Sequence, residues 1–244
     1  MTDPLRIHEM VEEEVIEKDY GRSVKPANVF SPSMVGYCKR QMYNRKFSLT
    51  EMPRYVQGIL HAGTVNHFWL EHNLPGMADD RSISTEVRVR TRIPAPDCTF
   101  DLFVYGEADV VDSKGNVYDH KFTGNTGYVV DEPKDKDKRQ VNMYVYGLDG
   151  VDTGQLEYVQ RDGTFHPTDS SVSVHTFEFD QELFDDTVEN MKAVAEEVKL
   201  AEKTGTEYQN PFEKCDCYFC EKETLKPEVK EELDRDSPDG NIYD

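Results

Sequence analysis

Two aspartates and a lysine in the middle of the chain have the types and spacing that metal-dependent chemistry requires. Asp119 and Lys121 are two positions apart, so their side chains share one face if the segment is a β-strand. Asp109 lies nearly opposite Asp119 if the chain reverses in a turn centred near Lys114. Two carboxylates that converge in this way cannot both stay ionised cheaply unless a cation lies between them. A hard divalent ion with oxygen ligands, Mg²⁺ or Mn²⁺, is the natural choice.

Lys121 adds a positive charge beside this predicted site. Its ammonium group could orient an attacking water molecule, or neutralise negative charge that develops on a scissile phosphate. The alternative is an ordinary Asp–Lys ion pair on a surface hairpin. These residues by themselves leave both interpretations open.

Four further residues could complete the site. His67 lies one helical turn after Gly63, a glycine that would permit close approach of another backbone, and its imidazole could ligate the metal. A lone helical histidine is, however, more often a core residue. Gln140 and Tyr144 are four positions apart, so one helical face would present an amide and a phenol to a phosphate or to the lysine, although Tyr144 could equally belong to the core. Glu86, expected just before the first long strand, is a candidate supporting acid.

Three cysteines lie close together near the C-terminus, in the order Cys215, Cys217 and Cys220. Zinc or an iron–sulfur cluster takes four such ligands. Cys38 and Cys98 are the available fourth ligands, and we favour Cys38 because Cys98 resembles a small hydrophobic residue in a loop. The crowding indicates a metal or a cluster in a reducing compartment, and ligation by Cys38 would join the two ends of the chain.

The composition indicates one large folded domain or two small ones. The chain has 244 residues, of which 37% are hydrophobic and 11% aromatic, and this excludes wholesale disorder. No apolar run approaches the ~20 residues that span a bilayer, and no basic-then-apolar leader is present, so we expect a cytoplasmic protein that does not bind membranes. The phosphate-binding loop G-x-x-x-x-G-K-[ST] is absent, which excludes an ATP-driven motor of that class.

The charge of the chain is strongly acidic, with 48 acidic against 28 basic side chains and a formal net charge of −20. Such a chain repels nucleic acids unless positive charge gathers locally. An acidic excess also suits a halophilic cytoplasm, where the Debye length falls to ~3 Å at 1 M salt and repulsion is screened. The candidate basic groups are Lys39, Arg40, Arg45, Lys46 and Arg54, then Arg88, Arg90 and Arg92, then Lys134, Lys136, Lys138 and Arg139.

The hydrophobic pattern predicts helices, then strands, a helix, strands and a helix, which is typical of an α/β or α+β domain with a central mixed sheet. The expected helices cover about residues 3–19, 34–47, 54–73, 139–148 and 180–203, and the expected strands about 86–92, 100–111, 117–122, 155–160 and 173–179. The predicted division is an acidic N-terminal helix and linker over 1–29, a single domain over 30–220, and an acidic, mobile tail over 221–244.

The order of these features resembles a known family. The order is Cys38, Gly63-x-x-x-His67, Asp109, Asp119-x-Lys121, Gln140-x-x-x-Tyr144, and then the three C-terminal cysteines. It resembles the RecB-like branch of the PD-(D/E)XK nucleases, and most closely the CRISPR-associated and viral exonucleases with an iron–sulfur cluster and the AddB-type nuclease domain. The sequence departs from the family in its more compact cysteine triplet, and in having no literal Pro-Asp at Asp109.

The resemblance implies a restriction-endonuclease-like core and a role for each matching residue. His67, Asp109 and Asp119 would bind Mg²⁺ or Mn²⁺, assisted by the backbone carbonyl of His120. Lys121 would be the catalytic lysine. Gln140 and Tyr144 would contact the substrate and steady the site. A 4Fe–4S cluster, with zinc as the alternative, would be held by Cys38, Cys215, Cys217 and Cys220.

The function implied by the resemblance is metal-dependent hydrolysis of DNA, by an exonuclease that acts on single-stranded or frayed ends. Its setting would be CRISPR spacer acquisition, as part of antiviral defence, or viral or cellular recombination, with an integrase or a recombination helicase as partner. One alternative is a non-catalytic factor that binds DNA ends or an integrase through the same fold. Another is a zinc-stapled interaction module whose carboxylates are ordinary surface groups.

Overall fold

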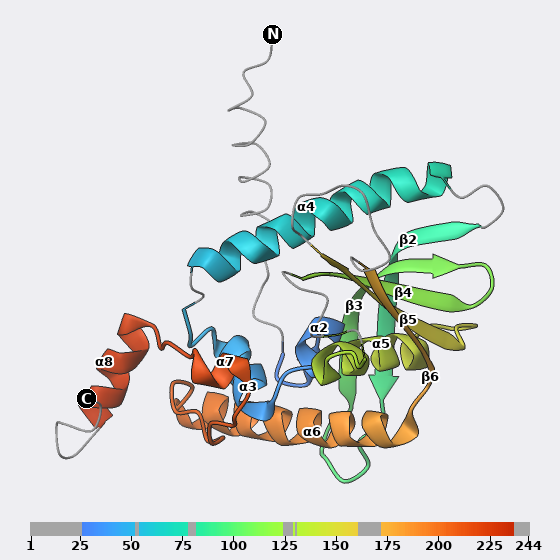
Figure 1. Ribbon diagram of the computed structural model, residues 1–244. Helices are drawn as coiled ribbons and strands as arrows, with labels where there is room; N and C mark the ends of the chain where they lie inside the picture. The colour runs from blue at the N-terminus through green and yellow to red at the C-terminus, as the bar shows by residue number, and fades with distance from the viewer. Residues whose placement is uncertain are drawn as a thin grey trace.

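The computed structural model describes residues 26–51, 54–77, 82–123, 129, 131–160 and 172–236. Within them, a mixed sheet is flanked by helices, with α4 on one side and α6 on the other in the view of Figure 1. The expected mixed α/β architecture is thereby confirmed. The helix expected over 3–19 and the end of the chain after residue 236 lie outside the described residues. No described helix is long and apolar enough to cross a membrane.

The elements follow one another in the expected order of helices and strands. The helices are α2 (Pro32–Val35), α3 (Lys39–Phe47), α4 (Arg54–Met77), α5 (Asp135–Gly147), α6 (Gln181–Thr204), α7 (Tyr218–Glu221) and α8 (Pro227–Asp236). The strands are β1 (Val29–Phe30), β2 (Ile83–Ile93), β3 (Leu102–Asp112), β4 (Asn116–Thr123), β5 (Thr153–Gln160) and β6 (Val172–Glu178).

Strands β2, β3 and β4 form an antiparallel meander, β5 lies parallel to β4, and β6 is antiparallel to β5. Helix α5 makes the crossover that a parallel β4–β5 pair requires. Strands β3 and β4 pair only at Val110–Tyr118 and Val111–Val117. Beyond these two pairs the ladder ends, and the residues that follow are free to direct their side chains into a shared site.

Two hydrophobic clusters hold the helices against the sheet. In the first, Met42 and Tyr43 of α3 and Met191 of α6 pack with Leu102 and neighbouring residues of β3. The second joins α5 to β4 and β5, and includes Val117, Val141, Tyr144, Leu156 and Tyr158. The second cluster fixes α5 over β4, which places the polar face of that helix against the carboxylates of the hairpin.

Helix boundaries differ from expectation where tertiary contacts intervene. The helix expected over 34–47 is two helices, separated at Gly36, where an added Cβ would lie 2.1 Å from the backbone oxygen of Lys136. The helix expected to end before Pro75 continues to Met77. In contrast, Asp180 caps α6 as expected, with its carboxylate accepting from the N–H of Leu183 at 2.9 Å.

Residues 221–236 form regular structure, although a charged, mobile tail was expected from residue 221. Thr50 and Leu225 form a β-bridge, α8 follows, and Val229 is buried in the first hydrophobic cluster. Figure 1 shows α7 beside the blue α3, so the C-terminal segment packs against an element near the start of the described chain.

Candidate functional site

The end of the β3–β4 ladder brings Asp109 and Asp119 into one site. These two residues occupy the positions next to the last pair, Val110–Tyr118. Asp109 fills the gap between the diverging strands, because its Oδ2 accepts the backbone N–H of His120 at 2.9 Å. The strand register therefore places the two acids opposite one another across the hairpin, as the sequence led us to expect.

Asp119 is buried, with 1% of its side chain exposed. Its Oδ1 accepts from Nε2 of Gln140 at 3.0 Å. Its Oδ2 lies 2.8 Å from Nζ of Lys121 but accepts no hydrogen bond with proper geometry from any described residue. Burial raises the pKa of Asp119 to about 6, and Asp109 adds to this effect while Lys121 opposes it. A divalent cation would offset the repulsion between this buried carboxylate and that of Asp109.

Lys121 is held between a carboxylate and an amide. Its Nζ donates to Oε1 of Gln140 at 3.0 Å and forms the ion pair with Asp119. Burial lowers the pKa of Lys121, but the charges of Asp119, Asp137 and Asp109 together outweigh this effect, so the net pKa lies above its ordinary value. The lysine is therefore an ammonium group at neutral pH, able to donate to an anion.

Gln140 and Tyr144 lie on the same face of α5 and contact each other. Nε2 of Gln140 lies 2.8 Å from the hydroxyl of Tyr144, which donates to the backbone carbonyl of Glu107 at 3.0 Å. Only 2% of Tyr144 is exposed. Its hydroxyl thus supports the amide of Gln140 from within the protein, and its ring belongs to the second hydrophobic cluster.

Helix α4 supplies His67, whose Nδ1 lies 3.3 Å from Oδ1 of Asp109. Burial lowers the pKa of His67, but the hydrogen bond and charge of Asp109, together with the charge of Asp119, outweigh this effect, so the net pKa is raised. The same contact holds the pKa of Asp109 below its usual value in spite of burial. The close backbone contact expected at Gly63 is not found, since no described atom lies within 4 Å of an added Cβ.

A small hollow lies beside Asp109 and has a volume of about 30 Å³, enough for a water molecule or an ion. Its walls come from α4 and the three strands of the meander, and are formed by His67, Leu70, Glu71, Glu86, Asp109, Val110 and His120. Nδ1 of His120 lies 3.0 Å from the carboxylate of Glu157, which fixes the ring. No sequence signal singled out Glu71 or Glu157, because only the packing of α4 and β5 brings them here.

Glu86 occupies an unusual position on β2. It lies within the strand, not before it, and directly opposite Asp109, because the pairs on either side are Thr85–Val110 and Val87–Ala108. The ladder omits this position, and Glu86 has a φ of 48°. A left-handed backbone in a residue with a side chain costs on the order of 1–3 kcal/mol and is common at active sites. Glu86, with this strained backbone, forms part of the wall of the hollow.

These groups fit a hard divalent ion. His67 and Asp109 line the hollow, with Nδ1 of His67 3.3 Å from Oδ1 of Asp109, and Asp119 lies on the neighbouring strand in an ion pair with Lys121. Mg²⁺ and Mn²⁺ prefer such oxygen-rich sites. The backbone carbonyl of His120 is the further ligand expected from the resemblance. The backbone N–H of the same residue donates to Asp109.

A second site is formed by four cysteines that the structure brings together. The ligand atoms of Cys38, Cys215, Cys217 and Cys220 all lie within 4.8 Å of one another. The sulfur of Cys38 is 3.6 Å from that of Cys220, which is 3.7 Å from that of Cys215. Cys98 lies elsewhere and contacts Glu196, so Cys38 is the fourth member of the group, as the sequence analysis favoured.

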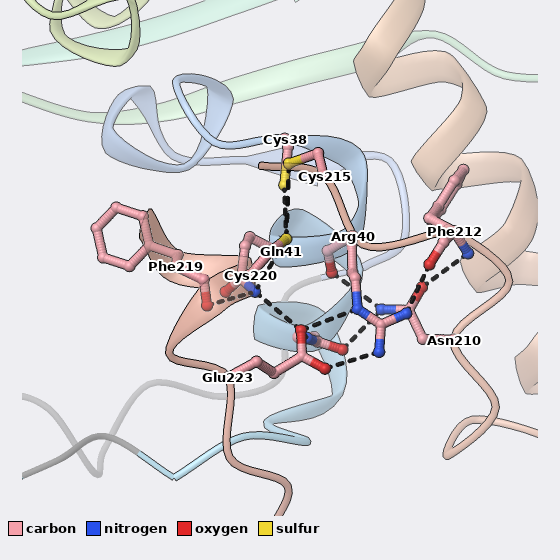
Figure 2. A network of polar contacts seen from close by, with 10 residues as sticks. Cys38, Arg40, Gln41, Asn210, Phe212, Cys215, Phe219, Cys220 and Glu223 are labelled. Atoms are coloured by element: carbon pink, nitrogen blue, oxygen red, sulfur yellow. Dashed lines mark hydrogen bonds and ion pairs between the residues drawn. The ribbon is translucent and has the colours of Figure 1, made fainter. Parts of the chain in front are cut away.

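A buried ion pair supports the four-cysteine site (Figure 2). Arg40 of α3 donates to both carboxylate oxygens of Glu223, at 2.9 and 2.7 Å, and 1% of the Glu223 side chain is exposed. Gln41 contacts the sulfur of Cys220 at 3.8 Å and Glu223 at 3.1 Å. Asn44 also donates to Glu223. The sequence analysis missed Glu223, because nothing in a charged C-terminal stretch distinguishes one buried acid from its exposed neighbours.

Two of the four cysteines, Cys38 and Cys217, favour the neutral thiol in the absence of a cation. Burial, together with the neighbouring thiols Cys215 and Cys220, raises the pKa of Cys38 well above its usual value. Burial likewise raises the pKa of Cys217. A bound metal ion would lower the pKa of these thiols, because its positive charge stabilises the thiolate form.

Comparison with known proteins gives a likeness of fold. No protein-family model matches the sequence, and no curated protein matches it. The crystal structure of SSO0001 matches with a TM-score of 0.60 and 18% identity, over 77% of this chain and 85% of that one. The alkaline exonuclease LHK-Exo from Laribacter hongkongensis matches with a TM-score of 0.48 and 10% identity, over 75% and 95%. The likeness to SSO0001 shows that the two chains share a fold.

Proposed function

We propose that this protein is a divalent-metal-dependent deoxyribonuclease that hydrolyses phosphodiester bonds at DNA ends. The observation that carries the proposal is the buried carboxylate of Asp119, held between Gln140 and Lys121 beside Asp109. An ordinary ion pair on a surface hairpin would be exposed to solvent, whereas only 1% of the Asp119 side chain is exposed. The buried arrangement supports a site built for a cation and an anionic substrate.

In this proposal each side chain of the site has a separate role. Asp109, Asp119, His67 and the backbone carbonyl of His120 would hold Mg²⁺ or Mn²⁺, which supplies Lewis-acid polarisation of a phosphate and lowers the pKa of a water molecule. Lys121 directs its ammonium protons toward the substrate phosphate and stabilises the charge that develops there. Gln140 fixes the positions of Asp119 and Lys121, and Tyr144 fixes Gln140.

Cleavage of end-labelled single-stranded DNA in Mn²⁺ tests this proposal. We expect Asp119→Asn and Lys121→Met each to lower the single-turnover rate by at least about a hundredfold, since each removes a charge used in the transition state. Asp152→Asn, which changes an exposed carboxylate, is the matched control and should cleave normally. Wild-type rates in both site variants, with folding verified, would show that the hairpin is not the active site.

The finer assignments extend this function. We propose an exonuclease that prefers single-stranded or frayed ends and processes DNA in CRISPR spacer acquisition or in viral or cellular recombination, beside an integrase or a recombination helicase. The non-catalytic alternative, a factor that only binds DNA ends, gives no reason to place the partly exposed Asp109 and Lys121 beside the buried carboxylate of Asp119.

At the four cysteines we propose a structural metal that joins α3 to the C-terminal segment. The resemblance implies a 4Fe–4S cluster, but the sulfur separations favour one tetrahedral zinc ion. Zinc–sulfur bonds of ~2.3 Å place tetrahedral thiolates about 3.8 Å apart, close to the 3.6–3.8 Å separations of the pairs in contact. Thiolates bound to four different irons of a cubane cluster lie further apart than thiolates on a single ion.

A further inference from the structure

One face of strands β2 and β3 carries a row of exposed arginines that begins at the candidate active site. Arg88, Arg90 and Arg92 alternate along β2 and are all exposed. Their cross-strand neighbours on β3 are Glu107, Tyr105 and Phe103, respectively. At the preceding position of the same row, Glu86 lies opposite Asp109, although the ladder omits this pair. With ~3.4 Å per residue, Arg88 and Arg90 lie about 7 and 14 Å along the strand from Glu86.

The other two basic groups of the chain are largely used within the protein. Arg40 is bound to Glu223, and the buried Lys46 donates to backbone carbonyls. Lys138 and Arg139 form ion pairs with acids of their own surroundings. The positive patches expected at these two groups are therefore reduced, because folding pairs much of their charge.

The arginines of β2 are paired with acids to a smaller extent than the basic side chains of these two groups. Arg92 pairs with Asp101 at 2.5 Å. Arg88 and Arg90 form no ion pair with any described residue, even though Glu107 is the cross-strand neighbour of Arg88. On a chain with a net charge of −20, two adjacent guanidinium groups without acidic partners constitute a local site for an anion.

An aromatic ring lies beside these arginines. Tyr105 is 36% exposed, and the guanidinium of Arg90 lies over its ring at 5.4 Å from the centroid. Phe103 follows on the same face, with its ring centroid 6.0 Å from that of Tyr105. An exposed aromatic ring flanked by arginines is the combination on which unpaired bases stack while their phosphates are neutralised.

We propose that the surface formed by Arg88, Arg90 and Tyr105, here called the β2–β3 track, binds the single strand that leads into the candidate active site. This proposal rests on the proposed nuclease function and names the form in which its substrate arrives. Arg88 and Arg90 contact successive phosphates, and Tyr105 stacks against a base. Stacking on Tyr105 requires an unpaired base, so the track selects a single strand over a duplex and reads little sequence.

Binding of a fluorescent oligo-dT strand, measured by anisotropy in EDTA across a salt series, tests the track without cleavage. Each lost phosphate contact on single strands lowers the salt slope by ~0.7, so Arg88→Ala/Arg90→Ala should lower it by about 1.4. Tyr105→Ala should weaken binding about tenfold, whereas Tyr105→Phe should bind like the wild type because it keeps the ring. Lys203→Ala/Lys230→Ala removes two exposed charges elsewhere and should leave the slope unchanged.

Several outcomes would overturn the track. They are a wild type that does not bind oligo-dT at low salt, an unchanged slope in the double arginine variant, an equal loss in the lysine control, or equal losses on blunt duplex. Equal binding by Tyr105→Ala and Tyr105→Phe would remove the stacking role. Mn²⁺-dependent hydrolysis of bis(p-nitrophenyl) phosphate by the wild type, a substrate too small to reach the track, reports separately on the proposed nuclease function.

Discussion

Gln140 and Asp119 are joined by a hydrogen bond of 3.0 Å from Nε2 to Oδ1, which links helix α5 to the buried end of strand β4. The same amide accepts from Lys121 through Oε1. One side chain thus orients both the acid and the lysine of the candidate active site, so its effect on the chemistry is indirect.

Replacement of Gln140 tests this positioning role. Gln140→Leu removes both hydrogen bonds at similar volume, and we expect kcat on DNA to fall about 10–100-fold, because Lys121 and Asp119 lose their fixed geometry. KM for DNA should change little, since the amide does not reach the strand. Gln181→Leu, at an exposed amide on α6, is the control. A change in KM alone would instead assign Gln140 to substrate binding.

Addition of the metal should stabilise the fold. An ion that binds only the folded state at 100 times its Kd adds about 2.7 kcal/mol, so Mn²⁺ should raise the Tm of the wild type. Asp109→Asn should lose this increase, because the variant offers one carboxylate fewer beside His67. Differential scanning calorimetry with and without Mn²⁺ measures the effect, and an equal rise in wild type and variant would place the ion elsewhere.

Glu86 should contribute to metal affinity from the opposite wall of the hollow. We expect Glu86→Gln to need about tenfold more Mn²⁺ for half-maximal cleavage, while the rate at saturating Mn²⁺ recovers, since a charge is lost but the ligands on β3 and β4 remain. Glu178→Gln, an exposed acid on β6, serves as control. Identical Mn²⁺ titrations for wild type and Glu86→Gln would remove Glu86 from the site.

Cys38 should be required for the structural metal, and Cys98 should not. After anaerobic purification we expect one zinc per chain, no acid-labile sulfide and no visible absorbance. Cys38→Ser should lose the metal and a large part of the stability, because it releases α3 from the C-terminal segment. Cys98→Ser should keep both. Brown protein with four irons and four sulfides per chain would establish the cluster instead.

The Arg40–Glu223 ion pair should be important for folding. Glu223→Gln leaves the buried guanidinium of Arg40 without its countercharge, and breaking a buried pair in this way costs about 3–5 kcal/mol. The pair Lys192–Glu189 gives the comparison, because its acid is 69% exposed and Glu189→Gln should cost at most about 1 kcal/mol. Urea unfolding measures both changes. Similar values for the two variants would mean that Arg40 is solvated when Glu223 is neutral.

The sequence by itself predicted the local structure and the members of the site. Hydrophobic periodicity indicated most of the strands and helices, because each element must present an apolar face to the core. The two-residue spacing of Asp119 and Lys121, and the four-residue spacing of Gln140 and Tyr144, indicated shared faces for the same reason. These features depend only on backbone geometry, which is the same in every strand and helix.

Only the tertiary structure decided which charges are buried and which remain available. In the sequence, Arg40 and Lys46 belong to a basic group. In the structure Arg40 binds Glu223 and Lys46 donates to a backbone carbonyl, whereas Arg88 and Arg90 stay exposed. Glu223 gave no comparable signal, because its role comes from partners distant in sequence, and the sequence singled out Glu86 without its strained backbone. Burial of a charge depends on which segments meet in space, and local sequence spacing does not contain that information.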